Sequence, residues 1–299
     1  MDRRRYLTEK LRDFELSKSS SKSDTITHFR TAISIANQRL DFITSSPELM
    51  ERLKTYFSEY QVQSNSPSGS EIFIEPLSAP AELPDLWENE DSDFDIKGDM
   101  VIHRDFAALM LKNQTNPTVI AFVSSELDDA FHNLLRWHIP PLLLKNNAFL
   151  MHSAGLIHDG SGYIFFGQSG AGKSTCSKLI QASDPRVQLI GDDAVIIEMK
   201  ADGPVLHSAP LGCGYTRLAP PKLSVPLAGI FSLRQSLKNS VDALSPSEGL
   251  ASLLSSAMVT SWDENIEERF ELAKLFTTSK PGIKALQFTK EFNFKESIL

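Results

Sequence analysis

The stretch GQSGAGKSTCSKLI, residues 167–180, decides how the rest of this chain is interpreted. An apolar segment, YIFF at 163–166, leads into it, and an amphipathic segment, KSTCSKLIQAS at 173–183, follows. The first eight residues fit the phosphate-loop pattern G-x-x-x-x-G-K-[ST] in full. They are Gly167, Gln168, Ser169, Gly170, Ala171, Gly172, Lys173 and Ser174. The sequence therefore predicts a strand, a phosphate-binding loop and a helix in succession.

Each residue type in this stretch has a chemical reason. Glycines let the backbone curl so that successive N–H groups point inward at phosphate oxygens. A helix that starts directly after the loop places its positive dipole end beneath the anion. Lys173 reaches the β and γ oxygens, and the Ser174 hydroxyl holds Mg²⁺. We predict that residues 167 to 175, Thr175 included, bind the phosphates of a nucleotide.

Two adjacent acids follow at a short distance. The segment LIGDD places Asp192 and Asp193 at the end of an apolar strand, only one short helix after the loop. In phosphate-loop proteins an acid at such a strand end holds the metal or orients the nucleophile. The plain alternative is a solvated turn, because Gly-Asp-Asp is good turn chemistry. The nearness of the phosphate loop favours the functional interpretation.

The run MHSAGLIHDGSGYIFFGQSGAGKSTCSKLIQASDPRVQLIGDDAVII, residues 151–197, resembles the catalytic core of the HPr kinase/phosphorylase family. The phosphoenolpyruvate carboxykinases share that fold distantly. The resemblance implies ATP and Mg²⁺ as cofactors, and it gives His152, which alone would be read as a core histidine like His158, a place in the active site. It also implies Lys173 as the loop lysine, Ser174 as a metal ligand, and the acidic pair as the source of the base for a seryl hydroxyl. Within the pair we assign Asp192 as the base and Asp193 as the metal ligand, and the reverse order stays open.

The chain departs from the family downstream. The bifunctional members carry an E-x-R-G-x-G segment tied to metal binding and phosphorolysis, whereas the comparable region here is VLHSAPLGCGYTR, residues 205–217. It has glycines but no glutamate or arginine before them. We therefore expect no phosphorylase reaction and no second metal ligand from this segment. Arg217 is a candidate clamp for the transferred group, with a surface arginine as the alternative.

The predicted fold class is α/β: a P-loop core of the HPr kinase/phosphoenolpyruvate carboxykinase type with a mixed sheet, plus a smaller N-terminal α+β domain. We divide the chain into a flexible or helical tether at 1–25, the α+β domain at 26–123 and the kinase domain at 124–299. Alternating residues at 27–46 predict paired strands, and Ser46 caps a helix that begins at Pro47. A helix at 126–147 should break or kink at Pro140 and Pro141. Residues 148–158 are expected to form one strand.

Composition limits the partners. The formal net charge of −8 argues against a general nucleic-acid binder. Two cysteines, Cys176 and Cys213, provide no disulfide framework and favour a reducing compartment. No run approaches the roughly 20 apolar residues that span a bilayer. We expect a cytoplasmic protein without membrane or nucleic-acid partners, and a homo-oligomer stays open as an alternative to a monomer.

The leading hypothesis is an ATP- and Mg²⁺-dependent kinase that transfers the γ-phosphoryl group to a serine-type hydroxyl of a protein or peptide. Two alternatives stay open: a metabolite kinase of the same fold, and a non-catalytic, nucleotide-dependent switch protein. An exposed groove beside Asp192 and Asp193 would favour a peptide, and a closed pocket would favour a metabolite. The presence of all four groups, Lys173, Ser174 and both acids, argues against a pure binder.

Overall fold

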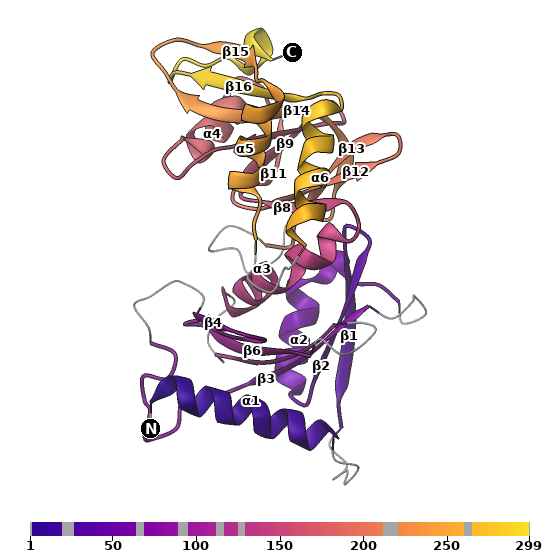
Figure 1. Cartoon of the computed structure of the whole chain (residues 1–299), viewed down its shortest axis with the longest axis vertical. Helices are drawn as coiled ribbons and strands as arrows, with labels where there is room; N and C mark the ends of the chain where they lie inside the picture. The colour runs from indigo at the N-terminus through magenta and orange to yellow at the C-terminus, as the bar shows by residue number, and fades with distance from the viewer. Residues whose placement is uncertain are drawn as a thin grey trace. The chain divides into compact units, whose positions relative to one another are not determined.

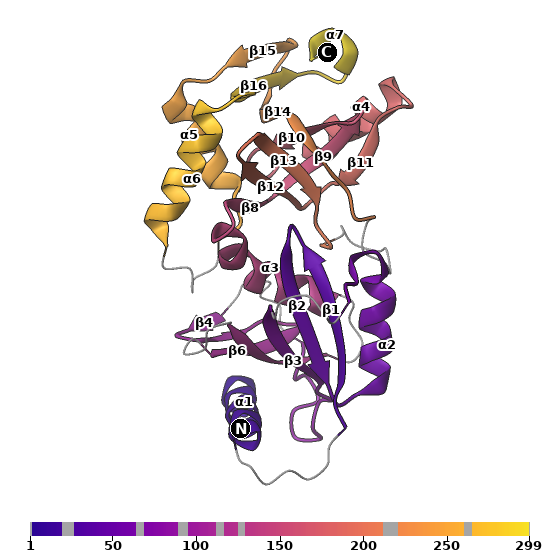
Figure 2. The same cartoon turned by 90° about the vertical axis from the view of Figure 1, so that its right-hand side faces the viewer.

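The chain forms a mixed α/β structure, with a seven-stranded sheet in its first part and two sheets that share one strand in its second part (Figures 1 and 2). The computed structural model describes residues 2–19, 27–63, 69–88, 95–111, 117–124, 129–211, 221–259 and 265–298. It divides into two compact units, Met1–Trp137 and His138–Leu299. The boundary between them falls inside helix α3 (Asp129–Leu144), later in the chain than the boundary at 123 that the sequence suggests.

The first unit is built on a seven-stranded sheet in the order β1-β2-β3-β7-β6-β5-β4. The pairs β2/β3 and β3/β7 are parallel, and the other neighbours are antiparallel. Its strands are β1 (Phe29–Ile35), β2 (Gln38–Thr44), β3 (Ser70–Pro76), β4 (Asp95–Lys97), β5 (Met100–Ile102), β6 (Phe106–Leu111) and β7 (Thr118–Val123). The hairpin β1–β2 confirms the paired strands predicted at 27–46.

Two helices cover this sheet. Helix α1 (Arg3–Ser19) packs on β6 and β7 and fully buries Leu7 and Leu11. Helix α2 (Pro47–Tyr56), followed by a 3₁₀ turn at Ser58–Tyr60, packs on β1 and β2. The Ser46 side chain accepts a hydrogen bond from the Leu49 N–H at 3.1 Å, which confirms the predicted cap. The segment predicted as a tether therefore begins with a packed helix, and its residues 20–25 lie outside the described part of the chain.

Helix α3 runs without a break through Pro140 and Pro141. Of the expected break or kink at these prolines, the break does not occur. A proline inside a helix removes one backbone hydrogen bond and crowds the preceding turn, at a cost of about 3 kcal/mol. Burial of Trp137, Ile139 and Leu143 on the same helix offsets that cost.

The second unit has nine strands in two sheets that share the long strand β14. The first half of β14 joins β13, β12 and β8, and its second half joins β10 and β16. The strands are β8 (Ala148–Met151), β9 (Ser153–His158), β10 (Ser161–Phe166), β11 (Gln188–Gly191), β12 (Val195–Lys200), β13 (Gly203–Ser208), β14 (Ser224–Gln235), β15 (Ser240–Ala243) and β16 (Ile283–Phe288). Within the second of these sheets the order is β11-β9-β10-β14-β16-β15.

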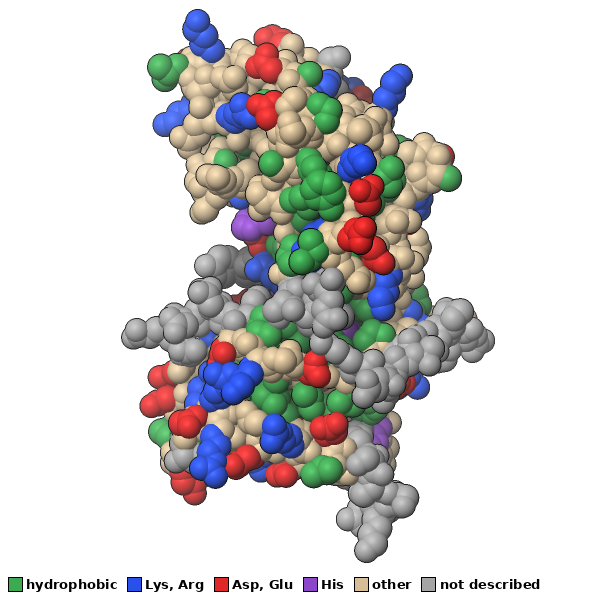
Figure 3. Space-filling view, in the orientation of Figure 1, with side chains coloured by type: hydrophobic (Ala, Val, Ile, Leu, Met, Phe, Trp, Pro, Cys, Tyr) green, Lys and Arg blue, Asp and Glu red, His purple; other side chains and the backbone are tan. Residues whose placement is uncertain are grey.

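The described part of this unit also includes the helices α4 (Lys173–Ser183), α5 (Pro246–Ser256), α6 (Ile266–Thr278) and α7 (Phe294–Ser297). Helix α5 begins at a Ser245 cap, which forms a full capping box with Glu248. Helix α6 buries Leu272 and Phe276, whereas Ile266, at its start, is exposed. Figure 3 shows hydrophobic side chains at the surface over α6.

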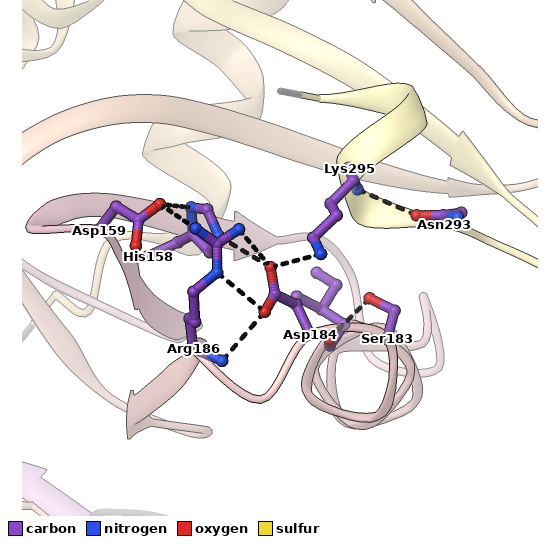
Figure 4. A network of polar contacts seen from close by, with 8 residues as sticks. His158, Asp159, Ser183, Asp184, Arg186, Asn293 and Lys295 are labelled. Carbon is purple, nitrogen blue, oxygen red and sulfur yellow. Dashed lines mark hydrogen bonds and ion pairs between the residues drawn. The ribbon is translucent and has the colours of Figure 1, made fainter.

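A buried carboxylate ties the end of α4 to the rest of the unit (Figure 4). Asp184 accepts a hydrogen bond from the Arg186 guanidinium at 2.9 Å and lies 2.9 Å from His158 Nε2. Lys295, from α7, approaches the same carboxylate at 3.3 Å. These partners, Arg186 first, hold the pKa of Asp184 well below its usual range. His158 thus has the core role that its sequence suggests.

No helix in the described ranges is long and apolar enough to cross a membrane.

Candidate functional site

The glycine loop, residues 167–172, connects β10 to α4 as the sequence predicts. Gly170 and Gly172 have φ values of 79° and 96°, in the left-handed region that favours glycine. Gln168, Ser169 and Gly170 are exposed, so the loop presents its backbone to solvent. Ser174 and Thr175 are also exposed, in the first turn of α4. The first N–H groups of a helix have no partner within the helix, so this end can receive an anion.

Two side chains hold the glycine loop. The Lys173 ammonium donates a hydrogen bond to the Gly167 carbonyl at 3.1 Å. The Gln235 amide, at the end of β14, donates to the Gly170 carbonyl at 2.7 Å. Within the loop, the Ala171 N–H bonds to the Gln168 carbonyl at 3.0 Å. Lys173 thus reaches back to the first residue of the loop, where it can exchange a carbonyl for a phosphate oxygen.

The helix after the glycine loop is fixed by its buried face. Cys176 and Ile180 are fully buried and pack with Phe165, Phe231 and Phe288. Burial of a side chain such as Ile180 contributes about 1.5–3 kcal/mol, which holds the helix N-terminus in place. Burial also raises the pKa of the Cys176 thiol to about 12, so this cysteine is a packing residue and not a nucleophile.

Strand register brings the other predicted residues to the same end of the sheet. Strand β9 is antiparallel to β10, with Ser153 opposite Phe166, so His152 lies beside the start of the glycine loop. Strand β11 is antiparallel to β9, with Gly191 opposite Gly155, so Asp192 follows β11 at that same end. We call this end the carboxyl edge, because β10, β11, β14 and β16 all finish there. Two inter-strand steps, about 10 Å, separate β11 from β10.

His152 and Asp193 are in contact. The His152 Nε2 atom lies 3.4 Å from a carboxylate oxygen of Asp193. The His152 side chain is 51% exposed and that of Asp193 is 25% exposed, so the pair faces solvent and is not buried in the core. The His152 N–H donates to the Ser256 carbonyl at 2.8 Å, which fixes the backbone between β8 and β9. Asp192 is half-buried next to this pair.

His152 also divides what the sequence predicts as one strand. Residues 148–158 form two strands, β8 and β9, with His152 between them, so the single-strand expectation is wrong. Strand β8 pairs with β12, and β9 pairs with β10 and β11. The chain changes sheets at this residue. Within a single continuous strand, His152 would be expected to face the core. Because the strand is interrupted at this residue, His152 lies at the carboxyl edge instead.

The donor set at this edge fits a magnesium nucleotide. Mg²⁺ prefers oxygen ligands, and in such sites it takes one or two carboxylates together with phosphate oxygens. Ser174 and Asp193 supply a hydroxyl and a carboxylate at the carboxyl edge. Among the described residues there is no group of three or more His, Cys, Asp or Glu side chains suited to a metal ion.

Residues 212–220 lie outside the described part of the chain, and with them Cys213, Arg217 and the glycines of GCG. Two residues that contact the glycine loop, Gln235 and Phe288, were not singled out from the sequence. Gln235 is the last residue of β14, and its position at the end of the apolar segment PLAGIFSLRQ, residues 226–235, was the available signal. Phe288 ends the terminal strand in the same way.

Residues 137–280 match the model of a protein family described as ScmC, SynChlorMet cassette protein ScmC. The match covers just under half of the chain and includes His152, the glycine loop and both acids. No curated protein matches the sequence. The family description names neither a reaction nor a ligand, so any function has to be argued from the residues of the carboxyl edge.

Proposed function

We propose that this protein is an ATP- and Mg²⁺-dependent kinase that transfers the γ-phosphoryl group to a serine-type hydroxyl of a protein or peptide. In this proposal the second unit is a P-loop core of the HPr kinase type. The observation that carries the proposal is the arrangement at the carboxyl edge. A complete phosphate-loop sequence on a strand–loop–helix unit lies two strands from an acidic pair, one member of which contacts His152.

The roles follow from the physics of phosphoryl transfer, in which positioning and charge stabilisation supply most of the rate. The N–H groups of residues 168 to 174 and the Lys173 ammonium bind the β and γ phosphates. Ser174 and Asp193 would hold Mg²⁺, which neutralises charge that develops on the phosphate oxygens. His152 contacts Asp193, the proposed metal ligand, so we assign it to orienting that carboxylate.

Asp192 serves as the base. It accepts the proton of the seryl hydroxyl as the hydroxyl oxygen forms a bond to the γ phosphorus. The bond from that phosphorus to the β–γ bridging oxygen breaks, and ADP leaves with the electron pair. The products are a phosphoserine-type ester and ADP, with the proton on Asp192.

The exposure of the site supports a large acceptor. The His152 side chain is 51% exposed, and Gln168 and Ser169 of the glycine loop are exposed. A metabolite kinase needs an enclosure that excludes water around both substrates. An open edge is better suited to a hydroxyl that is carried on a protein or peptide surface.

The test is transfer of label from γ-labelled ATP, with Mg²⁺, to peptides and proteins encoded beside this gene. The description of the matched family as a cassette protein supports that choice of substrates. We expect label on a seryl hydroxyl, and a rate about 10²–10⁴-fold lower for Asp192→Asn, the range for loss of a general base. Asp202→Asn, an exposed residue in the turn between β12 and β13, is the matched control and should keep the full rate.

Two results would count against the proposal. Label transfer to free serine or another metabolite, but to no peptide, would favour the metabolite kinase. Full activity of Asp192→Asn would show that Asp192 is not the base.

A further inference from the structure

We propose that a pocket beside the glycine loop binds the nucleoside part of the nucleotide. The pocket has a volume of about 610 Å³. It lies on the side of β10 away from the acidic pair, and this inference rests on the proposed function. Its lining comes from three segments of the carboxyl edge: Gly172 and Thr175, Gln235 to Leu237, and Phe288 to Glu291.

The order of the strands determines where the pocket lies along the carboxyl edge. Strand β14 is parallel to β10, and β16 is parallel to β14, with Gln235 opposite Phe288 at their ends. Across the carboxyl edge the sequence is therefore β11, β9, β10, β14 and β16. Ligands of open α/β sheets bind outside the carboxyl ends of strands. With phosphates on the loop after β10 and the acidic pair beyond β9, the space after β14 and β16 receives the other end of the nucleotide.

The distances agree with this division. Four inter-strand steps separate β11 from β16, about 19 Å in all. An extended nucleoside triphosphate is of that order of length, so its γ-phosphate and its base can reach opposite ends of the row. The glycine loop lies at the middle of the row, where the phosphate chain would cross.

The pocket and the glycine loop share atoms. Gly172 lines the pocket and is the last loop residue, and a Cβ there would lie 2.8 Å from Phe288 Cζ. Gln235 lines the pocket and bonds to the Gly170 carbonyl. A ligand in the pocket therefore continues directly into the loop. Because the pocket is continuous with the glycine loop, it differs from a hollow elsewhere on the surface.

The lining has the chemistry that a nucleoside needs. Leu237 is 97% exposed, an apolar side chain that gains burial by covering a flat base. Phe288 forms part of the floor, with its ring held by Phe292 at 6.2 Å between centroids. Thr289 and Glu291 offer a hydroxyl and a carboxylate for ribose hydroxyls. The Asn239 side chain accepts from the Thr289 N–H at 2.7 Å, so the two walls of the pocket are joined.

The experiment compares the affinities of ATP and inorganic tripolyphosphate, both with Mg²⁺, for the full chain by titration calorimetry. We expect ATP to bind at least about tenfold more tightly, the order of effect that base contacts give. Leu237→Ser should weaken ATP about fivefold or more and leave tripolyphosphate unchanged. Thr289→Trp, which fills the pocket, should bring the ATP affinity down to that of tripolyphosphate.

Two further variants separate this inference from the proposed function. Lys173→Met should weaken both ligands, because the lysine binds phosphate. Leu275→Ser, on exposed α6, is the matched control for Leu237→Ser and should change neither affinity. Equal affinities of ATP and tripolyphosphate for the unmodified chain, or an unchanged ATP affinity in Leu237→Ser, would overturn the pocket and leave the phosphate site standing. Failure of both ligands to bind would overturn the proposed function together with the pocket.

Discussion

At the scale of single residues, Gly172 meets two separate requirements. Its φ of 96° is one that residues with a Cβ rarely adopt, and its Cα faces the ring of Phe288. Phe288 is only 7% exposed and packs against Phe292, so its ring has little room to move aside. Packing against Phe288 therefore requires a glycine at this end of the loop, independently of any role in phosphate binding.

Gly172→Ala should destabilise the protein by about 1–3 kcal/mol from backbone strain, with a similar additional cost from the clash with Phe288. The control is Gly160→Ala. Gly160 has a φ of 77°, but a Cβ added there would meet no atom within 4 Å, so this variant reports strain alone. Urea unfolding of both variants measures the difference. Equal losses in the two variants would show that Phe288 does not constrain the loop.

At the scale of elements, helix signals in the sequence were reliable because they are local. Ser46 and Ser245 cap helices where their sequences place them, since a cap bonds within its own first turn. Strand signals were less complete: β4, β6, β13 and β15 were not anticipated. Strands β4, β6 and β13 pair with their chain neighbours β5 and β12, so local signals were missed there. Strand β15 pairs with β16, a segment distant in the chain, and no local pattern indicates that pairing. The break at His152 belongs to the same class. It depends on which strands pair with β8 and β9, and no local sequence pattern indicates that pairing.

The residues of the candidate site also differ in how well the local sequence predicts them. The glycine loop is contiguous, so residue order alone predicts its strand, turn and helix. His152 and Asp193 are 41 positions apart, and only the register of β9 against β10 and β11 brings them within 3.4 Å. The resemblance to a known family suggested both residues, but composition and periodicity did not pair them. Gln235 and Phe288 were not predicted to contact the glycine loop for the same reason.

The polar contacts of Asp184, which join α4 to β9 and α7, predict that the stability of the protein depends on pH. Asp184 is a carboxyl whose pKa is lowered in the folded state, first by Arg186 and then also by His158 and Lys295. Its stabilising contribution is complete above the unfolded pKa of about 3.8 and is lost as the pH falls from there through the lower folded pKa. We expect the free energy of unfolding to decline with acid in this range.

Asp184→Asn should remove this part of the acid dependence and lower stability at neutral pH. Thermal unfolding between pH 2.5 and 7 measures both effects, with Asp202→Asn as the exposed matched control. An acid limb in Asp184→Asn as steep as in the unmodified chain would show that other groups govern it.

At the scale of the whole molecule, the proposed chemistry belongs to one of the two units. All predicted site residues in the described part of the chain lie in His138–Leu299. The family match, at residues 137–280, begins at the boundary between the units and includes those residues. The first unit, with its own sheet and core, contributes none of them.

Both proposals require a magnesium nucleotide to lie along the carboxyl edge of the second unit. A crystal structure with Mg²⁺ and a non-hydrolysable ATP analogue is the decisive experiment. We expect phosphates on the N–H groups of residues 168 to 174, the metal on Ser174 and Asp193, and the base between Leu237 and Phe288. Phosphates bound away from the glycine loop, or a γ-phosphate pointing away from Asp192 and Asp193, would contradict both proposals.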